Sequence, residues 1–337
     1  MWLSLLQFRW LSSPAEWFFL IADVLIVAFI VVNIVDINRF VVRKTVLSSE
    51  KIPEGEEIRF VFLTDLHSRK YAGNNEKLLR EIRACNPDFI LCGGDMMTAK
   101  EGKNNEPAVS FMNRLAEDYK IYYAFGNHEF RAREYKESYG SMYEDYRKAV
   151  RSDNIIWLDN ESVAVVLKKD KSALRIINER MIRSEEDPEI TVNSEYNPED
   201  NSKRDIRIYI SGLSIEKVYY KRLVKQKLPE GYVAKTVGPR REDIYQILLA
   251  HNPQYADDYF AYGADLFLSG HYHGGVIRLP FIGGVASPAI RLFPKYSGGL
   301  YHKNDKYGYV SCGLGTHTVP MRFLNPGEVS YFEIKHK

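Results

Sequence analysis

A long apolar run stands near the N-terminus, before any alternating pattern begins. Residues 17–35 form a stretch of 19 residues with one formal charge, Asp23, and about 20 apolar residues suffice for a helix to span a bilayer. No small-residue cleavage site accompanies the run, which disfavours a cleaved signal peptide. We therefore expect residues 1–40 to be a membrane anchor with a helix at about 17–35. A signal peptide and a soluble core helix are the alternatives.

Basic residues around this run indicate its orientation. Arg9 lies before it, whereas Arg39, Arg43, Lys44 and Lys51 follow it. Because the side richer in Lys and Arg stays in the cytoplasm, the pattern predicts a single-pass protein of the cell membrane with its main domain in the cytoplasm. The lipid bilayer is then the first expected partner.

Beyond this run the pattern changes to short apolar runs that alternate with amphipathic segments. β-Branched and aromatic runs at 58–64, 88–92 and 120–125 predict strands, and the segments 76–85 and 107–115 have helical character. Strand–helix–strand repetition of this kind is typical of parallel β-α-β units. Further strands are expected at 162–167, 206–212, 244–250, 264–268, 307–312 and 329–334.

These signals divide the chain into the anchor, a linker at 41–56 and one α/β domain at 57–335. The stretch at about 168–205 is rich in charge and predicts a surface insertion, either a solvated loop or a hairpin. The 46 basic and 44 acidic residues give a net charge of +2, so charge indicates no nucleic-acid binding. Three cysteines are too few for a disulfide framework. The sequence leaves the oligomeric state unknown.

Metal-binding side chains directly follow five of the predicted strands. In open α/β sheets ligands collect at the carboxyl ends of strands, so we expect these side chains to meet. Each block alone is a weak signal, but chance does not explain all five in this order. The blocks are Asp65-Leu66-His67, Gly93-Gly94-Asp95, Gly126-Asn127-His128-Glu129, His251 and Gly270-His271-Tyr272-His273.

Together these blocks resemble the calcineurin-like metallophosphoesterase superfamily. The segments GHYHGGVIRLPF and GLGTHTVPMRFLNPGE resemble its bacterial membrane-anchored branch, which includes phosphodiesterases and hydrolases of UDP-2,3-diacylglucosamine; Val276 stands where that branch usually has Gln. The resemblance covers about residues 57–335. It implies a four-layer αββα sandwich of two mixed sheets with a two-metal site at one edge.

The resemblance also implies how the ligands are divided. One ion takes Asp65, His67 and His273, the other takes Asn127, His251 and His271, and Asp95 bridges both. Imidazole and carboxylate ligands without a thiolate favour manganese, iron, zinc or nickel over calcium, and we expect two divalent ions, manganese first. A shared carboxylate holds two ions ~3.5–4 Å apart, close enough to share the hydroxide that attacks the phosphorus.

His128 directly follows a ligand, and we expect it to act as the general acid or as a donor to the phosphoryl oxygens; a structural role in its loop is the alternative. His317 can line the substrate side, whereas His302 and His336 are expected on the surface. The expected function is a membrane-anchored dimetal phosphoesterase acting on a phosphodiester or pyrophosphate, with lipid-linked and UDP-2,3-diacylglucosamine-like substrates among the candidates. A membrane-attached binding or scaffold protein is the alternative, which the complete ligand set disfavours.

Overall fold

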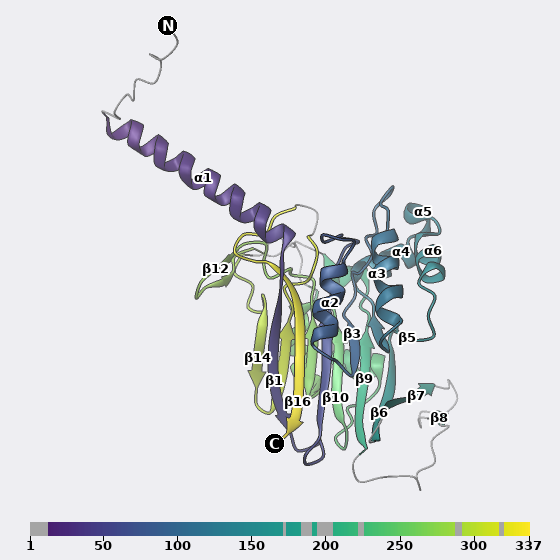
Figure 1. The fold of residues 1–337 in the computed structure, drawn as a ribbon. Coiled ribbons are helices and arrows are strands. Elements are labelled where there is room, and N and C mark those ends of the chain that lie inside the picture. The colour runs from purple at the N-terminus through teal and green to yellow at the C-terminus, as the bar shows by residue number, and fades with distance from the viewer. Residues whose placement is uncertain are drawn as a thin grey trace.

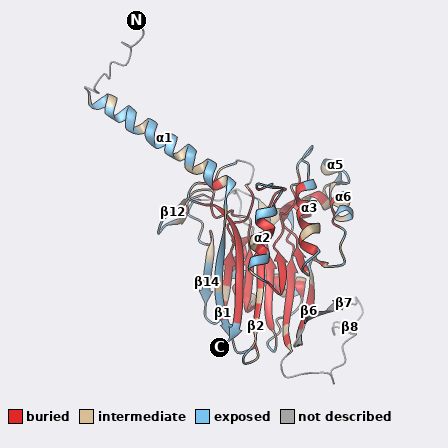
Figure 2. Cartoon of the chain, viewed as in Figure 1, coloured by how far each residue is buried: buried red, intermediate tan, exposed pale blue. Residues whose placement is uncertain are grey.

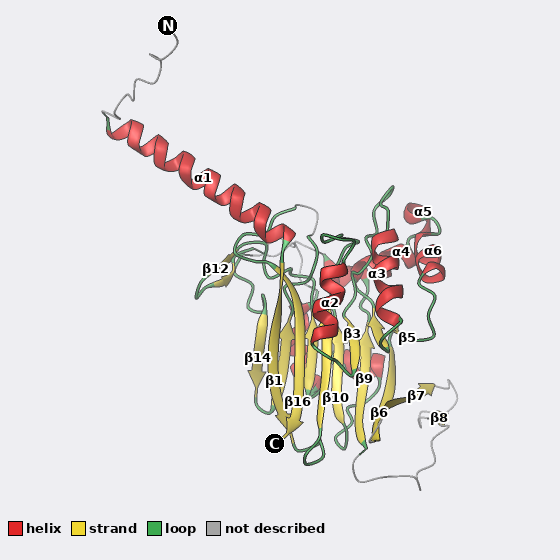
Figure 3. Ribbon diagram, in the orientation of Figure 1, coloured by secondary structure: helices red, strands yellow, loops and turns green. Residues whose placement is uncertain are grey.

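Two β-sheets packed face to face form the centre of the structure, and helices cover both outer faces (Figures 1 and 3). The computed structural model describes residues 13–170, 173–182, 191–193, 205–221, 226–286, 292–316 and 320–337. Within these ranges, one sheet has six strands, the other has eight, and β12 (Arg278–Leu279) and β13 (Gly283–Gly284) form a small third sheet. Both large sheets are mixed, which confirms the four-layer αββα sandwich.

The six-stranded sheet runs in the order β1-β16-β2-β3-β4-β5. β2 to β5 are parallel, β16 is antiparallel to β2, and β1 pairs in parallel with β16. All residues of β3 and β4 are apolar or aromatic and buried, as is typical of strands covered on both faces. The strands are β1 (Phe40–Ser49), β2 (Glu57–Leu63), β3 (Phe89–Cys92), β4 (Ile121–Ala124), β5 (Ile155–Leu158) and β16 (Gly327–His336).

The eight-stranded sheet runs in the order β14-β15-β11-β10-β9-β6-β7-β8. Its centre, from β15 to β9, is parallel, and the strands on either side are antiparallel. The strands are β6 (Glu161–Asp170), β7 (Ala173–Ile182), β8 (Thr191–Asn193), β9 (Ile206–Leu213), β10 (Tyr245–Ala250), β11 (Leu266–Ser269), β14 (Gly299–Lys303) and β15 (Lys306–Val310).

Three apolar clusters hold the layers together, and Figure 2 shows them as the buried interior. Phe60, Ile247 and Phe332 belong to the cluster between the two sheets. A second cluster packs α2, α3, α4 and α6 on the six-stranded sheet, and a third packs α7 and α8 on the other. The helices of the body are α2 (Glu76–Ala84), α3 (Glu106–Ala116), α4 (Asn127–Glu134), α5 (Lys136–Tyr139), α6 (Met142–Ala149), α7 (Tyr232–Val237) and α8 (Ala256–Tyr262), with short 3₁₀ turns η2 (Lys217–Tyr220) and η3 (Pro253–Tyr255).

Helix α1 (Pro14–Asn38) leaves this body as a single apolar rod (Figure 1). A capping box fixes its start: the Glu16 backbone N donates to Ser13 Oγ at 3.2 Å, and the Ser13 backbone N donates to Glu16 Oε2 at 3.1 Å. The helix begins before and ends after the expected 17–35. It is long and apolar enough to cross a membrane, and most of its apolar side chains are exposed (Figure 2).

The prediction of a linker at 41–56 is wrong for most of its length. Strand β1 occupies Phe40–Ser49 and pairs along all ten residues with β16. Leu47 is buried in the core between the sheets. The ordered body therefore begins directly after α1. Much of β1 is exposed, because it is the edge strand, so its sequence lacks the apolar alternation that marks the inner strands.

The charged stretch at 168–205 is a hairpin where it is described. β7 pairs antiparallel with β6, and β8 pairs antiparallel with β7 at the edge of the sheet. Residues 171–172, 183–190 and 194–204 lie outside the described residues. Of the two alternatives for this insertion, the described part favours the hairpin.

Candidate metal centre

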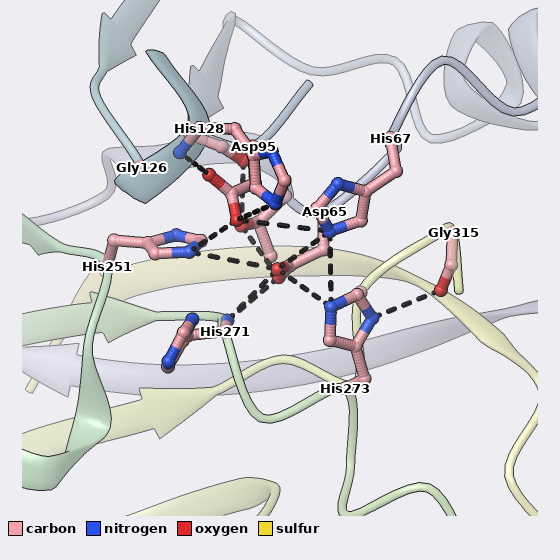
Figure 4. A network of polar contacts seen from close by, with 12 residues as sticks. Asp65, His67, Asp95, Gly126, His128, His251, His271, His273 and Gly315 are labelled. Atoms are coloured by element: carbon pink, nitrogen blue, oxygen red, sulfur yellow. Dashed lines mark hydrogen bonds and ion pairs between the residues drawn. The ribbon is translucent and has the colours of Figure 1, made fainter. Parts of the chain in front are cut away.

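The five motif blocks meet at one edge of the sandwich, as Figure 4 shows. Each block follows the carboxyl end of a strand: β2 leads to Asp65 and His67, β3 to Asp95, β4 to Asn127, β10 to His251, and β11 to His271 and His273. The donor atoms of Asp65, His67 and His273 all lie within 4.8 Å of one another. The same holds for the donor atoms of Asp95, His251 and His271. The structure therefore brings together the side chains that the sequence places far apart.

The Asp95 carboxylate lies at the centre of the cluster and is fully buried. Its Oδ2 atom is 3.1 Å from His251 Nε2, 3.8 Å from His67 Nε2 and 4.0 Å from His128 Nε2. Its Oδ1 atom accepts a hydrogen bond of 2.7 Å from the backbone N of His128, at the first turn of α4. One oxygen is thus fixed by the protein, while the other faces imidazoles from both groups.

The Asp65 carboxylate occupies the other half of the cluster. Its Oδ1 atom is 3.3 Å from His273 Nε2 and 3.8 Å from both His67 Nε2 and His251 Nε2. The backbone N of His271 donates to both Asp65 oxygens, at 3.1 and 3.0 Å. The loop that carries the two final histidines is therefore tied directly to the first motif.

Two imidazoles direct their Nε2 atoms into the cluster, while backbone carbonyls hold their Nδ1 atoms. His251 Nδ1 lies 2.7 Å from the carbonyl oxygen of Gly93, and His273 Nδ1 lies 3.1 Å from that of Gly315. A carbonyl only accepts, so each Nδ1 carries the proton and each neutral ring leaves a lone pair on Nε2. This tautomer is the one that metal ligands adopt when a backbone carbonyl orients them.

His128 has the opposite tautomer. Its Nδ1 atom accepts a hydrogen bond of 2.8 Å from the backbone N of Ala99. The neutral ring therefore carries its proton on Nε2, the atom that faces Asp95 Oδ2. Although His128 lies within ligand distance of His67 and Asp95, an Nε2–H group donates a proton or a hydrogen bond and does not coordinate a metal.

Asn127 is the first residue of α4 and is buried. Its Oδ1 atom has no hydrogen-bond partner among the described residues. A buried polar atom without a partner is costly, and an amide oxygen is a good ligand for a hard cation. This observation fits the expected role of Asn127 as a neutral ligand.

The backbone of the motifs is strained. Non-glycine residues seldom adopt positive φ, and each such residue costs of order 1–3 kcal/mol, which the surrounding fold must sustain. Gly126 and Gly270 admit close approach as well: a Cβ atom would lie 2.2 Å from Asp95 Oδ1 at Gly126 and 2.3 Å from Asp65 Oδ2 at Gly270. The residues with φ between 48° and 65° include Asp65, His67, Asp95, His271 and His273.

Burial and the mutual repulsion of the Asp65 and Asp95 carboxylates make negative charge in the cluster costly. Burial raises the pKa of the Asp65 carboxyl to about 6, and the neighbouring Asp95 carboxylate adds to the rise. Burial alone would lower the pKa of the His251 imidazole, but the carboxylates of Asp95 and Asp65 raise it to about 9. The site therefore attracts positive charge, and divalent cations would satisfy the buried carboxylates in place of a proton on His251.

Three supporting residues have no assigned role in the sequence-based prediction. Glu129 accepts hydrogen bonds from the backbone N atoms of Asp95, at 2.8 Å, and Gly126, at 3.1 Å. Buried Arg322 donates to the carbonyl of Gly315, the group that orients His273. Asn325 Nδ2 donates at 2.6 Å to the carbonyl of His273. All three lie within the quoted motif segments, but only the structure reveals their partners.

A pocket of about 1040 Å³ opens over the cluster, and His67, Asn127, His128 and His271 form part of its wall. Its described lining contains no carboxylate. The cations that line the pocket are Arg69, Lys70, Lys100, Lys103, Arg131, Lys217 and Lys221.

The other histidines lie away from this pocket where they are described. His302 and His336, at the C-terminal end of β16, are exposed, as expected. His317 lies outside the described residues.

Comparisons with known proteins agree with this geometry. Residues 58–275 match the family model described as calcineurin-like phosphoesterase. The chain is 37% identical over 100 residues to the uncharacterized metallophosphoesterase YkuE of Bacillus subtilis, a match that covers 30% of this chain and 34% of that protein. It is 25% identical over 305 residues to an uncharacterized metallophosphoesterase of Helicobacter pylori, covering 88% of this chain and 64% of that protein.

A relative from Aquifex aeolicus, also an uncharacterized metallophosphoesterase, is 26% identical over 301 residues, covering 88% of this chain and 92% of that protein. The matches to the first two relatives thus span about a third and just under two thirds of their lengths.

Proposed function

Because the chain belongs to the calcineurin-like phosphoesterase family, we propose that it is a membrane-anchored dimetal phosphoesterase that hydrolyses a phosphodiester or a pyrophosphate. The observation that carries this proposal is the cluster itself, in which Asp95 Oδ2 faces imidazoles of both ligand groups on the floor of a cation-lined pocket. We assign Asp65, His67 and His273 to one ion, Asn127, His251 and His271 to the other, and Asp95 to both.

The donor set supports divalent ions such as Mn²⁺, with iron, zinc or nickel as alternatives. Bound there, two such ions would supply Lewis acidity and an activated water for attack on phosphorus. The protein contributes the rest. Its buried carboxylates balance the positive charge of the ions, and the carbonyls of Gly93 and Gly315 orient the imidazoles of His251 and His273.

His128 is the proton donor in this proposal. The backbone N of Ala99 occupies its Nδ1 atom, so its Nε2–H points into the cluster. A group held in this way can protonate a leaving oxygen, or donate a hydrogen bond to a phosphoryl oxygen, without competing for a metal. Arg131 lies beside His128 and lines the same pocket, where its guanidinium can contact a second anionic group of the substrate.

The lining of the pocket supports a substrate with more than one negative charge. Lys100 and Lys103 line it without an ion-pair partner among the described residues, and no carboxylate in the described lining opposes them. A pyrophosphate, or a nucleotide-linked lipid similar to UDP-2,3-diacylglucosamine, presents such charge. A phosphodiester with a single charge would use only part of this surface.

The position of α1 supports a substrate that reaches the pocket from a membrane. Arg69 lines the pocket and donates from Nη2 to Asn38 Oδ1, at the last residue of α1, at 3.1 Å. The end of the apolar helix therefore contacts the wall of the pocket at Arg69. The basic residues that follow α1 favour an orientation with the catalytic body in the cytoplasm.

A substrate panel tests the proposal on the full-length chain. Hydrolysis would be measured with Mn²⁺, Zn²⁺, Ni²⁺ and Fe²⁺ on phosphomonoesters, diesters, nucleotides and lipid-linked pyrophosphates in vesicles, with Asp95→Asn as the inactive control. We expect the highest kcat/KM for a lipid-linked diester or pyrophosphate. Turnover of no phosphoester with any of these metals would contradict the enzyme proposal; equal kcat/KM for soluble and vesicle-embedded substrates would contradict only the lipid-linked part.

A further inference from the structure

Exposed apolar side chains gather beside the last turns of α1. Phe281 is fully exposed at the tip between β12 and β13, and Ile282 is 61% exposed. Phe293 is 60% exposed, and its backbone N donates to the carbonyl of Val285 on the same hairpin at 2.8 Å. We name this set the apolar rim: Leu279, Phe281, Ile282, Leu292, Phe293 and Leu324.

The apolar rim is attached to the side of α1. The ring of Phe29 stacks on that of Phe323, with centroids 4.8 Å apart. The backbone N of Arg278 donates to the carbonyl of Phe323 at 3.0 Å, and the backbone N of Arg322 donates to Asn33 Oδ1 at 2.8 Å. Figure 1 shows the β12–β13 hairpin at the end of the body from which α1 leaves. Arg322 and Phe323 thus tie the rim to the helix at Phe29 and Asn33, within its last ten residues.

The length of α1 determines what covers this region. The capping box fixes the start of the helix at Pro14. From Pro14 to Phe29 the helix covers only about 24 Å at 1.5 Å per residue, which is less than the ~30 Å of a hydrocarbon core. A spanning helix must therefore bury some of the turns that follow Phe29. Consistently, Ile30, Val31 and Ile34 are apolar and about half exposed.

We propose that the apolar rim inserts into the bilayer beside α1 and seats the catalytic body on the membrane surface. The turns after Phe29 lie level with Arg322 and Phe323, so a bilayer that covers them also reaches the rim. The inference rests on the proposed insertion of α1. It adds a second point of membrane contact, which restricts rotation of the body about the helix and keeps the pocket wall at Arg69, which contacts Asn38, at the headgroups.

Spin labels on the full-length chain in phosphatidylethanolamine–phosphatidylglycerol nanodiscs test this proposal. Single cysteines would replace Phe281 in the rim, Val27 in the middle of α1 and Val46 on exposed β1, in a Cys85→Ser background. Accessibility to oxygen and to a water-soluble nickel chelate would be measured by electron paramagnetic resonance. We expect the Phe281 and Val27 labels to be accessible to oxygen and shielded from nickel, and the Val46 label to be accessible to nickel.

The outcomes separate this inference from the proposed function. If the Val27 label lies in lipid while the Phe281 label is as accessible to nickel as the Val46 label, the rim does not insert although the anchor does. If the Phe281 label is shielded from both reagents, a second protein copy covers the rim, and the inference is overturned. If the Val27 label is itself accessible to nickel, the membrane anchoring fails. A label at Ile282 provides an independent position should Phe281→Cys fold poorly.

Discussion

The metal centre and the contact between the last turns of α1 and segment 322–326 both use polar side chains at the same end of the molecule, but they are built differently. At the metal centre, Asp95 and its neighbours are buried, strained and brought together from five strand ends. At the end of α1, Asn33 and Asp36 bind backbone N–H groups of one segment, those of Arg322 and Asn325. The first region offers side chains to a ligand, whereas the second uses them to attach one part of the chain to another.

The two regions meet in the segment 322–326. Asp36 Oδ2 accepts from the backbone N of Asn325 at 2.8 Å, and the side chain of Asn325 donates to the carbonyl of His273. Asn325 is therefore the only residue in this chain of contacts between the helix and His273, a proposed metal ligand. The comparison predicts that changes in the first region abolish chemistry and that changes in the second mainly cost stability.

The largest expected effect is at Asp95. Asp95→Asn removes the charge shared by both ions, and metal catalysis contributes several kcal/mol, so turnover should fall by ~10³-fold or more. Asn127→Ala, which touches one ion, should lose less activity. Metal content by mass spectrometry and turnover of the two purified variants would check this. Two metals per chain and near-normal turnover in Asp95→Asn would refute the shared role.

The next effect concerns β1 and tests where the folded body begins. A chain starting at Arg39 keeps β1, whereas one starting at Glu50 loses buried Leu47 and leaves the buried carboxylate of Glu328 without Arg43, its ion-pair partner at 3.0 Å. The second chain should lose about 3 kcal/mol or more in free energy of unfolding relative to the first. Denaturant unfolding of both would measure it; equal stabilities would mean that β1 does not belong to the body.

A smaller effect is expected at His128. His128→Ala should slow hydrolysis of an alkyl diester by ~10²-fold, on the usual scale of general acid catalysis. A nitrophenyl ester, whose leaving group needs little protonation, should be affected less, and metal content should be unchanged. Comparing kcat on the two substrates tests this. Equal losses on both would assign His128 to stabilisation of transition-state charge instead of proton donation.

The smallest effect tests the attachment of α1. Asp36→Ala leaves the buried N–H of Asn325 without its acceptor, which should cost about 1–2 kcal/mol of stability. Asp23→Ala is the matched control, because Asp23 lies in the same helix but is exposed. Thermal unfolding in detergent would compare them. If Asp36→Ala and Asp23→Ala unfold alike, the contact with Asn325 does not hold the helix to the body.

The sequence predicts the centre of this molecule better than its margins. Inner strands such as β3 and β4 are recognisable because they are wholly apolar, and the metal-binding side chains because they follow such strands. β1 is not recognisable, since an edge strand that pairs with a segment almost 290 residues away has no local pattern of its own. Arg322 and Asn325 lie in a motif, yet their support of His273 depends on contacts that only the folded chain provides.

Anomalous diffraction from crystals of the full-length chain grown with Mn²⁺ would test the dimetal assignment most directly. We predict two manganese peaks that both contact the Asp95 carboxylate, with His128 Nε2 coordinating neither. A single peak, two peaks of which only one contacts Asp95, or a peak coordinated by His128 would contradict the assignment. The ligand shells expected around the two peaks are Asp65, His67 and His273 for one, and Asn127, His251 and His271 for the other.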